Sequence, residues 1–175
     1  MPTTYTLISS VTVGSGGAAT MSFTSIPSTY TDLKVVASLR ATGSRSTDAL
    51  VLYYNSDTTG TNYPLLFMRG DGSSTGGGLI TSGYSGMYSA EINGGTSTTS
   101  TFTNFEMYIS NYRSANQKSS SIDVVQEANQ SVAYNQFVAP RWTSTSAITS
   151  ITLTDHNGNN FAQYSTAYLY GISNT

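Results

Sequence analysis

Apolar and polar residues alternate along several short stretches of the chain, most clearly between residues 31 and 40. Every second position there is apolar: Leu33, Val35, Ala37 and Leu39. A repeat of two residues places successive side chains on opposite faces of an extended strand. We therefore predict a strand with one face in the core and one wetter face, which carries Lys34, Val36, Ser38 and Arg40.

Comparable stretches recur along the chain, separated by glycine, proline and Asn-Gly turns, and no helical repeat persists. The further predicted strands cover residues 6–13, 19–23, 49–54, 63–68, 101–111, 119–126, 132–142, 147–154 and 164–172. The pattern predicts a single all-β domain over residues 1–175, an antiparallel, jelly-roll-like β-sandwich of about 8–10 strands. An immunoglobulin-like sandwich is the alternative, but it needs fewer strands, and no Cys…Trp…Cys spacing supports it.

Glycines are concentrated between residues 69 and 95, where they alternate with tyrosine and methionine. We predict one long excursion here, with weak strands at 78–81 and 88–92. Long loops in compact domains often carry function, and aromatic residues, methionine and arginine are enriched at interfaces. We therefore expect a partner to bind around Arg69, Tyr84, Met87, Tyr88 and, outside the excursion, Tyr112.

Charged residues make up only 9% of the chain, against about 25% in ordinary soluble domains, and the formal net charge is −2. The basic residues are scattered, which argues against nucleic acid as a partner. No stretch approaches the ~18 apolar residues of a membrane span, and residues 1–10 do not have the pattern of a signal peptide. With no cysteine, disulfides and thiolate metal sites are excluded.

Candidate catalytic residues are few. His156 is the only histidine and lies beside Asp155 in an Asn-Gly turn, where the two side chains point to different sides, so we interpret it as a turn residue rather than part of a triad. The carboxylates that a glycosidase pair would need are Glu91, Glu106, Asp123 and Glu127. Glu106 falls on the polar face of its predicted strand, which favours a solvated position. We expect no enzyme activity.

Metal and sugar sites are weakly indicated. Asp71-Gly72-Ser73 and Asp155-His156-Asn157-Gly158 are only fragments of a calcium-loop pattern, so we expect neither a metal nor a cofactor. Sugar binding through stacked tyrosine rings is an alternative, with candidates Tyr84, Tyr88, Tyr112 and Tyr134. Packing of these rings on a sheet face is the simpler interpretation.

Three segments resemble small virion proteins of tailed bacteriophages, many of them from aquatic phages. The segments are FTSIPSTYTDLKVVASLR at residues 23–40, RWTSTSAITSITL at 141–153 and NFAQYSTAYLYGI at 160–172. Residues 42–100 match least, and Gln163-Tyr164 departs from the small residues usual in the last segment. The motifs fit a scaffold, in which Pro27 fixes a turn that Tyr30 and Asp32 cap, while Leu169, Tyr170 and Ile172 seat the last strand.

This resemblance implies a β-sandwich subunit of a phage particle. We expect it to be made in the host cytoplasm and to lie on the capsid exterior. We expect a capsid decoration (cement) protein that forms a homotrimer and binds the assembled lattice of the major capsid protein. A nearly uncharged surface suits dense packing against other subunits. The alternatives are a tail or fibre module that binds a receptor or a host surface glycan, and, more remotely, a glycan-degrading enzyme.

Overall fold

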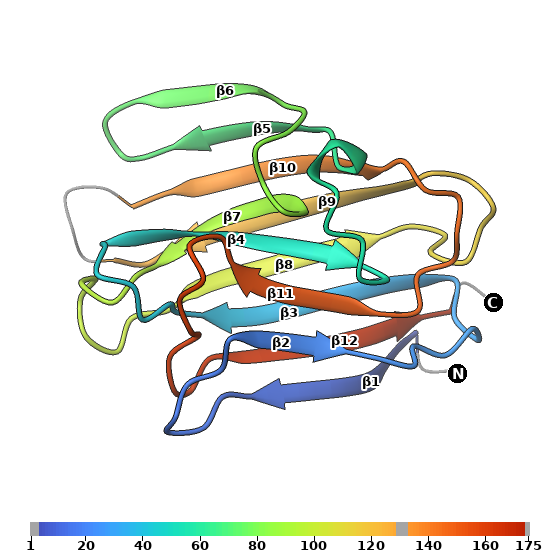
Figure 1. Ribbon diagram of the computed structural model, residues 1–175, viewed down its shortest axis with the longest axis horizontal. Coiled ribbons are helices and arrows are strands. Elements are labelled where there is room, and N and C mark those ends of the chain that lie inside the picture. Colours follow the sequence, from blue (N-terminus) through green and yellow to red (C-terminus); the bar gives the residue numbers. More distant parts are fainter. Residues whose placement is uncertain (1–3, 129–132, 174–175) are drawn as a thin grey trace.

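The computed structural model describes residues 4–128 and 133–173, in which twelve strands form two antiparallel sheets (Figure 1). The larger sheet has the order β1 (Tyr5–Thr12), β12 (Thr166–Ile172), β3 (Asp32–Leu39), β8 (Thr103–Ile109), β9 (Lys118–Gln126), β10 (Asn135–Trp142), β5 (Leu65–Gly70) and β6 (Thr75–Ile80). The smaller sheet has the order β2 (Thr20–Phe23), β11 (Ile151–Asp155), β4 (Thr47–Tyr54) and β7 (Met87–Asn93). The predicted antiparallel β-sandwich is confirmed, whereas this strand order does not confirm the jelly-roll detail.

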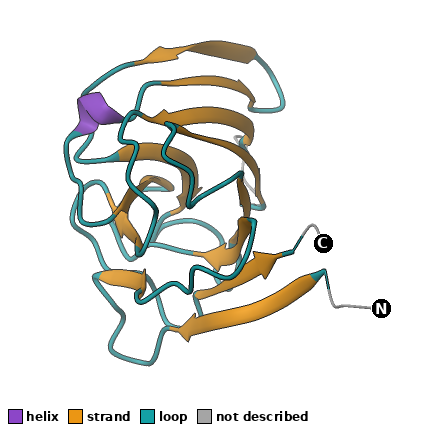
Figure 2. Cartoon of the chain, turned by 90° about the vertical axis from the view of Figure 1, so that its right-hand side faces the viewer, coloured by secondary structure: helices purple, strands orange, loops and turns teal. Residues whose placement is uncertain are grey.

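Apart from the strands, the described residues contain one turn of 3-10 helix, η1 (Gly60–Asn62). Figure 2 shows the chain as strands and loops, with this turn at the margin. Within residues 4–128 and 133–173, no helix is long and apolar enough to cross a membrane.

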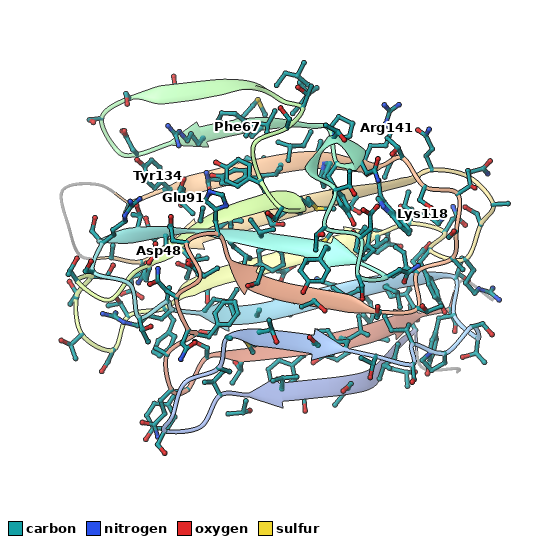
Figure 3. The ribbon with its side chains drawn as sticks, viewed as in Figure 1. Asp48, Phe67, Glu91, Lys118, Tyr134 and Arg141 are labelled. Carbon is teal, nitrogen blue, oxygen red and sulfur yellow. The ribbon has the colours of Figure 1, made fainter. Side chains whose placement is uncertain are left out.

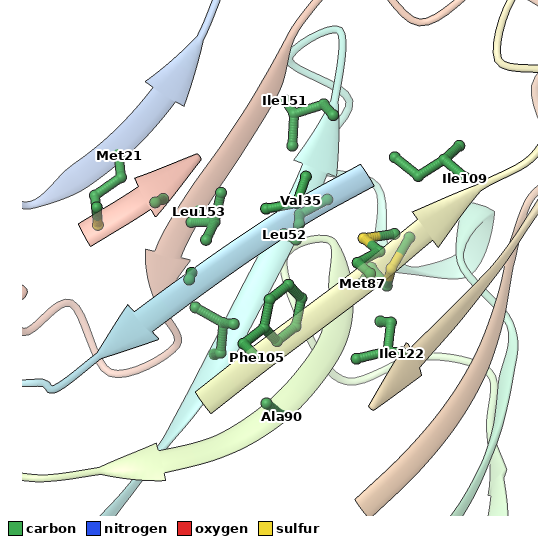
Figure 4. Packing of buried hydrophobic residues seen from close by; sticks show 14 of the residues in the cluster. Met21, Val35, Leu52, Met87, Ala90, Phe105, Ile109, Ile122, Ile151 and Leu153 are labelled. Atoms are coloured by element: carbon green, nitrogen blue, oxygen red, sulfur yellow. The ribbon is translucent and has the colours of Figure 1, made fainter. Parts of the chain in front are cut away.

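The core lies between the two sheets and is built from the alternating residues that the sequence indicates. The predicted inward residues are all buried: Leu33, Val35, Ala37 and Leu39 of β3, and Phe105, Met107 and Ile109 of β8. In Figure 4, Val35 and Phe105 lie against Leu52 and Leu153 of the smaller sheet. Each fully buried side chain of this size contributes about 1.5–3 kcal/mol, so the two-residue repeat carries much of the fold's stability.

The segment between residues 69 and 95 differs from the single excursion that we predicted. Both weak strands form, so the total exceeds the ~8–10 strands expected. β6 extends the larger sheet beside β5, and β7 pairs with β4 in the smaller sheet, so the segment crosses between layers. Gly86, with φ of 133°, makes this crossing possible, because a Cβ there would lie 2.9 Å from the carbonyl oxygen of Leu52.

Two strand boundaries also differ from the prediction. Residues 147–150 do not join β11, because the side chain of Asn55 takes up their backbone groups. Its Oδ1 accepts hydrogen bonds from the amides of Thr149 at 2.8 Å and Ser150 at 3.1 Å, and its Nδ2 donates to the Ala147 carbonyl at 2.7 Å. The predicted strand 132–142 begins at a position outside the described residues, and β10 begins at Asn135.

The turn at Pro27 is closed by a residue other than those we expected. The hydroxyl of Tyr112 donates to the Pro27 carbonyl. Asp32 instead accepts hydrogen bonds from the Tyr108 hydroxyl at 2.6 Å and the Asn111 amide at 2.7 Å, which joins the start of β3 to the end of β8. The carboxylate of Asp32 thus binds groups at the end of β8, and its role in capping the turn stays a prediction.

Candidate docking surface

Four large apolar side chains stand on the outer face of the larger sheet at its β10–β5–β6 end: Leu66, Met68, Leu79 and Phe137. The strand register brings them together. Met68 lies opposite Phe137, and Leu66 lies between Ala139 of β10 and Leu79 of β6. Residues directly opposite one another in a sheet point to the same face, so the four form one continuous patch. We call these four residues the apolar face.

The apolar face is widely open to solvent. The exposed fractions are 57% for Phe137, 61% for Leu66, 64% for Leu79 and 65% for Met68. With the neighbouring backbone, these side chains line a groove of about 650 Å³, whose walls are almost entirely apolar. Contiguous exposed apolar surface on a soluble domain marks an interaction site more often than isolated apolar residues do.

Glycine shapes one side of this groove. Gly77 of β6 lies opposite Met68, on the same face. A Cβ atom at Gly77 would be 2.9 Å from the Phe67 carbonyl oxygen and 3.7 Å from the Met68 side chain. Because Gly77 has no side chain, the side of Met68 that faces β6 stays uncovered. The glycines of β6 thereby keep the groove open.

β6 is also an edge strand. It ends the order of the larger sheet, and no strand of the described residues pairs with its outer side. Every residue of β6 except Ile80 is exposed. In Figure 1 this end of the sheet projects beyond the smaller sheet. An uncovered edge beside an apolar patch gives a partner both backbone hydrogen-bonding groups and apolar surface.

Charged side chains stand on the outer face over β3, β8 and β9, beside the apolar face. Lys34 Nζ lies 2.7 Å from Glu106 Oε2, and the Glu106 side chain is 55% exposed, so its predicted solvated position is confirmed. Glu106 lies opposite Asp123 across β8 and β9, which makes these two the neighbouring pair among the candidate carboxylates. They stand on an open sheet face. Glu91 belongs to the smaller sheet, and Glu127 follows β9.

The structure brings together four of the five predicted partner residues, behind the apolar face on the inner side of β5. Met87 and Tyr88 are nevertheless buried, with exposed fractions of 0% and 3%. The ring of Tyr84 covers Tyr88, with 5.0 Å between ring centroids, and its other neighbour is the ring of His156 at 4.6 Å. The prediction of Met87 and Tyr88 as contact residues is therefore wrong, because the crossing segment buries both faces of β7.

Tyr112 and Arg69 serve other roles within the chain. Tyr112 is 1% exposed and belongs to the core, so its prediction as a contact residue is also wrong. The guanidinium of Arg69 lies over the rings of Phe67 at 5.8 Å and Tyr134 at 5.0 Å; Figure 3 labels both rings. Arg69 and Tyr84 remain partly exposed, and their role in binding stays a prediction.

A hydrogen-bonded group stiffens the support beneath the apolar face. The Tyr88 hydroxyl donates to Glu91 Oε1 at 3.1 Å and accepts from Gln136 Nε2 at 3.0 Å, and the Glu91 amide donates to Gln136 Oε1 at 2.6 Å. Burial raises the pKa of Glu91, while the Tyr88 hydrogen bond and the charge of Arg69 act in the opposite direction. These contacts join β7 to β10 and fix the strand that carries Phe137.

The apolar face was not among our sequence predictions, although a signal was present. Residues 65–68 read Leu-Leu-Phe-Met, and residues 137–139 read Phe-Val-Ala. In such strands both the odd-numbered and the even-numbered positions are apolar, so both faces of the strand are apolar. One face packs on the core through Leu65 and Val138, and the other exposes Leu66 and Phe137 to solvent.

His156 lies in the turn after β11, as predicted. Within the part of the chain that the structure describes, no group of three or more His, Cys, Asp or Glu side chains is placed to hold a metal ion.

Comparisons of the chain with protein-family models, with curated proteins and with solved structures found no match. This surface and the sequence resemblance are accordingly the two features that indicate a function.

Proposed function

We propose that the chain is a structural subunit of a bacteriophage virion that docks on the assembled capsid as a decoration protein, and that the apolar face is its contact. The single observation that carries the docking is the continuous exposed patch of Leu66, Met68, Leu79 and Phe137. The phage assignment comes from the resemblance of residues 23–40, 141–153 and 160–172 to virion proteins.

The chemistry of the apolar face favours a protein partner over a sugar. A sugar needs convergent hydrogen-bonding groups around a stacking ring, and the groove walls are almost entirely apolar. Two of the four tyrosines that could stack on a sugar, Tyr88 and Tyr112, are buried. The tail-module alternative is weaker for that reason.

A decoration role also suits the strength of such a contact. Burying apolar area contributes about 25 cal/mol per Å², and four side chains give a modest contact beside the ~800 Å² per partner of a standard interface. A subunit that forms the expected homotrimer would make this contact several times on one lattice, and linked contacts add avidity. Because it binds only the assembled lattice, it would stabilise that state.

The test is binding of the purified protein to capsids that lack it, measured by co-sedimentation. Phe137→Ser and Leu66→Ser remove exposed apolar groups, so the variants should fold normally and bind about 10–100-fold more weakly, as expected for losing ~1.5–3 kcal/mol. Leu7→Ser is the matched control, since Leu7 is 52% exposed on β1, at the opposite edge of the sheet. We expect Leu7→Ser to bind like the wild type.

Two results would refute the proposal. One is equal binding by the wild type, Phe137→Ser and Leu66→Ser. The other is an absence of the protein from intact purified heads. The homotrimer is tested separately by analytical ultracentrifugation of the free protein.

A further inference from the structure

Asp48 of β4 and Asp155 of β11 lie next to each other inside the sandwich, at one end of the smaller sheet. The register pairs Asp155 with Leu50, and Asp48 precedes Leu50 by two positions on the same face of β4. The two aspartates are thus diagonal neighbours across adjacent strands. Their exposed fractions are only 2% and 3%. Figure 3 labels Asp48 near the start of β4.

Each of the two carboxylates has one oxygen that is hydrogen-bonded and one that is not. Asp155 Oδ1 accepts from the backbone amides of Asn157 at 2.8 Å and Asn159 at 3.0 Å, and Asp48 Oδ1 accepts from Asn157 Nδ2 at 3.0 Å. The Oδ2 atoms of both are buried without a partner. Among the described residues only Gln126 Nε2 shares that condition. A buried acceptor without a donor is costly, and more so when it carries charge.

No basic side chain of the described residues neutralises this pair. The one salt bridge there joins Lys34 and Glu106, on the outer face of the other sheet. Arg45 is the basic residue whose charge acts on Asp48, and it is exposed. Burial raises the pKa of Asp48, and the charge of Asp155 raises it further. A cation bound at the two unpartnered Oδ2 atoms would neutralise the pair and supply the missing partner.

We propose that Asp48 and Asp155 bind one calcium ion through their two unpartnered Oδ2 atoms, with the side-chain amides of Asn157 and Asn159 as further ligands. Calcium is bound by 6–8 oxygens from carboxylates, amides, carbonyls and water. The turn places Asp155, Asn157 and Asn159 at alternate positions, as calcium loops do. Asp48 then supplies from β4 the second carboxylate that this short turn lacks.

The asparagine side chains are already at the site. Asn159 Nδ2 donates to Asp155 Oδ1 at 3.1 Å, and Asn157 Nδ2 donates to Asp48 Oδ1. A half-turn of an amide exchanges its nitrogen and oxygen. Each amide can therefore present oxygen to a cation from nearly the same position.

Two glycines let the backbone approach Asp48 Oδ2 closely. A Cβ atom at Gly43 would overlap Asp48 Oδ2, and one at Gly94 would lie 3.3 Å from it. Bound calcium would therefore connect the 155–159 turn to the loops before β4 and after β7, which supply Gly43 and Gly94. This site lies on strands of the smaller sheet, whereas the apolar face lies on the larger sheet, and the site does not depend on the function proposed above.

The experiment compares thermal unfolding of the full chain in calcium chloride and in EDTA, with calorimetric titration of calcium. The wild type should bind one calcium per chain, and its Tm should rise by about 5–10 °C at about 100 times Kd. Asp48→Asn and Asp155→Asn keep the Oδ1 acceptor and remove the charge. Both should fold, as circular dichroism can verify, and lose most of the shift. Asp123→Asn, an exposed strand aspartate, is the matched control and should retain it.

The stability of the variants in EDTA distinguishes a calcium site from a purely structural role of the two aspartates. In EDTA, Asp48→Asn should be at least as stable as the wild type, because it removes an uncompensated buried charge. A wild-type Tm that is equal in calcium and in EDTA would overturn the proposal. So would a calcium shift that survives in both asparagine variants.

Discussion

Asp57, which is partly buried, shows what a fully hydrogen-bonded carboxylate does in this chain, in contrast to Asp48. Its Oδ2 accepts hydrogen bonds from Trp142 Nε1 at 2.8 Å and Asn62 Nδ2 at 2.9 Å, and its Oδ1 accepts from the Thr59 amide at 3.0 Å. The Trp142 ring stacks on Tyr63 with 6.4 Å between centroids. Asp57 thereby connects the loop around η1 to β10, the strand that carries Phe137.

Replacing Asp57 should destabilise the fold in a way that depends on pH. Burial acts to raise the pKa of Asp57, but the hydrogen bonds from Trp142, Asn62 and Thr59 outweigh it and lower that pKa. A lowered pKa stabilises the folded state above the ordinary aspartate value, and this contribution disappears as pH falls through the lowered value. We expect Asp57→Ala to lose about 1–3 kcal/mol near neutral pH.

Urea unfolding from neutral to acidic pH measures this effect. The difference between wild type and Asp57→Ala should shrink as the pH falls, whereas Asp123→Ala should resemble the wild type throughout. A difference that stays constant with pH would mean that Asp57 acts through packing alone.

At the scale of the element, β12 shows how one small residue seats a strand. Gly171 lies opposite Leu33 of β3, and the ring of Tyr30 covers it, so that a Cβ at Gly171 would overlap the ring. The resemblance assigned the seating of this strand to Leu169, Tyr170 and Ile172. Leu169 and Ile172 are indeed buried, but the close contact with the turn before β3, which carries Tyr30, is made at Gly171.

Gly171→Ala should therefore destabilise the protein by about 1–3 kcal/mol, because Tyr30 must move to admit the methyl group. Thermal or urea unfolding measures the change. Gly14→Ala is the matched control, because no atom lies within 4 Å of its Cβ position. Adding Tyr30→Ala should relieve much of the strain, so purely additive effects of the two substitutions would contradict this account.

For the whole molecule, the unequal sheets decide which surfaces stay available. Eight strands face four, so the β5–β6 end extends past the smaller sheet. The central strands β3 and β8 have neighbours on both sides and a buried inner face. β6 has one neighbour and little burial.

Amide hydrogen exchange of the free protein should follow this arrangement. Amides of β3 and β8 should exchange slowest, through global unfolding, and those of β6 should exchange much faster, through local opening. Mass spectrometry of the exchanged protein resolves the two regions. If β6 were as protected as β8, its edge would be covered in solution by a second copy of the chain.

The class of fold and the buried faces of several strands follow from the amino-acid pattern alone. The alternation at 31–40 and 101–111 suffices for this, because a two-residue repeat sets the face of each side chain without reference to distant residues. Only the tertiary structure decided that residues 69–95 form strands of two different sheets, that Leu66 and Phe137 stay uncovered, and that Asp48 meets Asp155. These outcomes depend on pairing between segments far apart in the chain, and local patterning carries no information about which strands become neighbours.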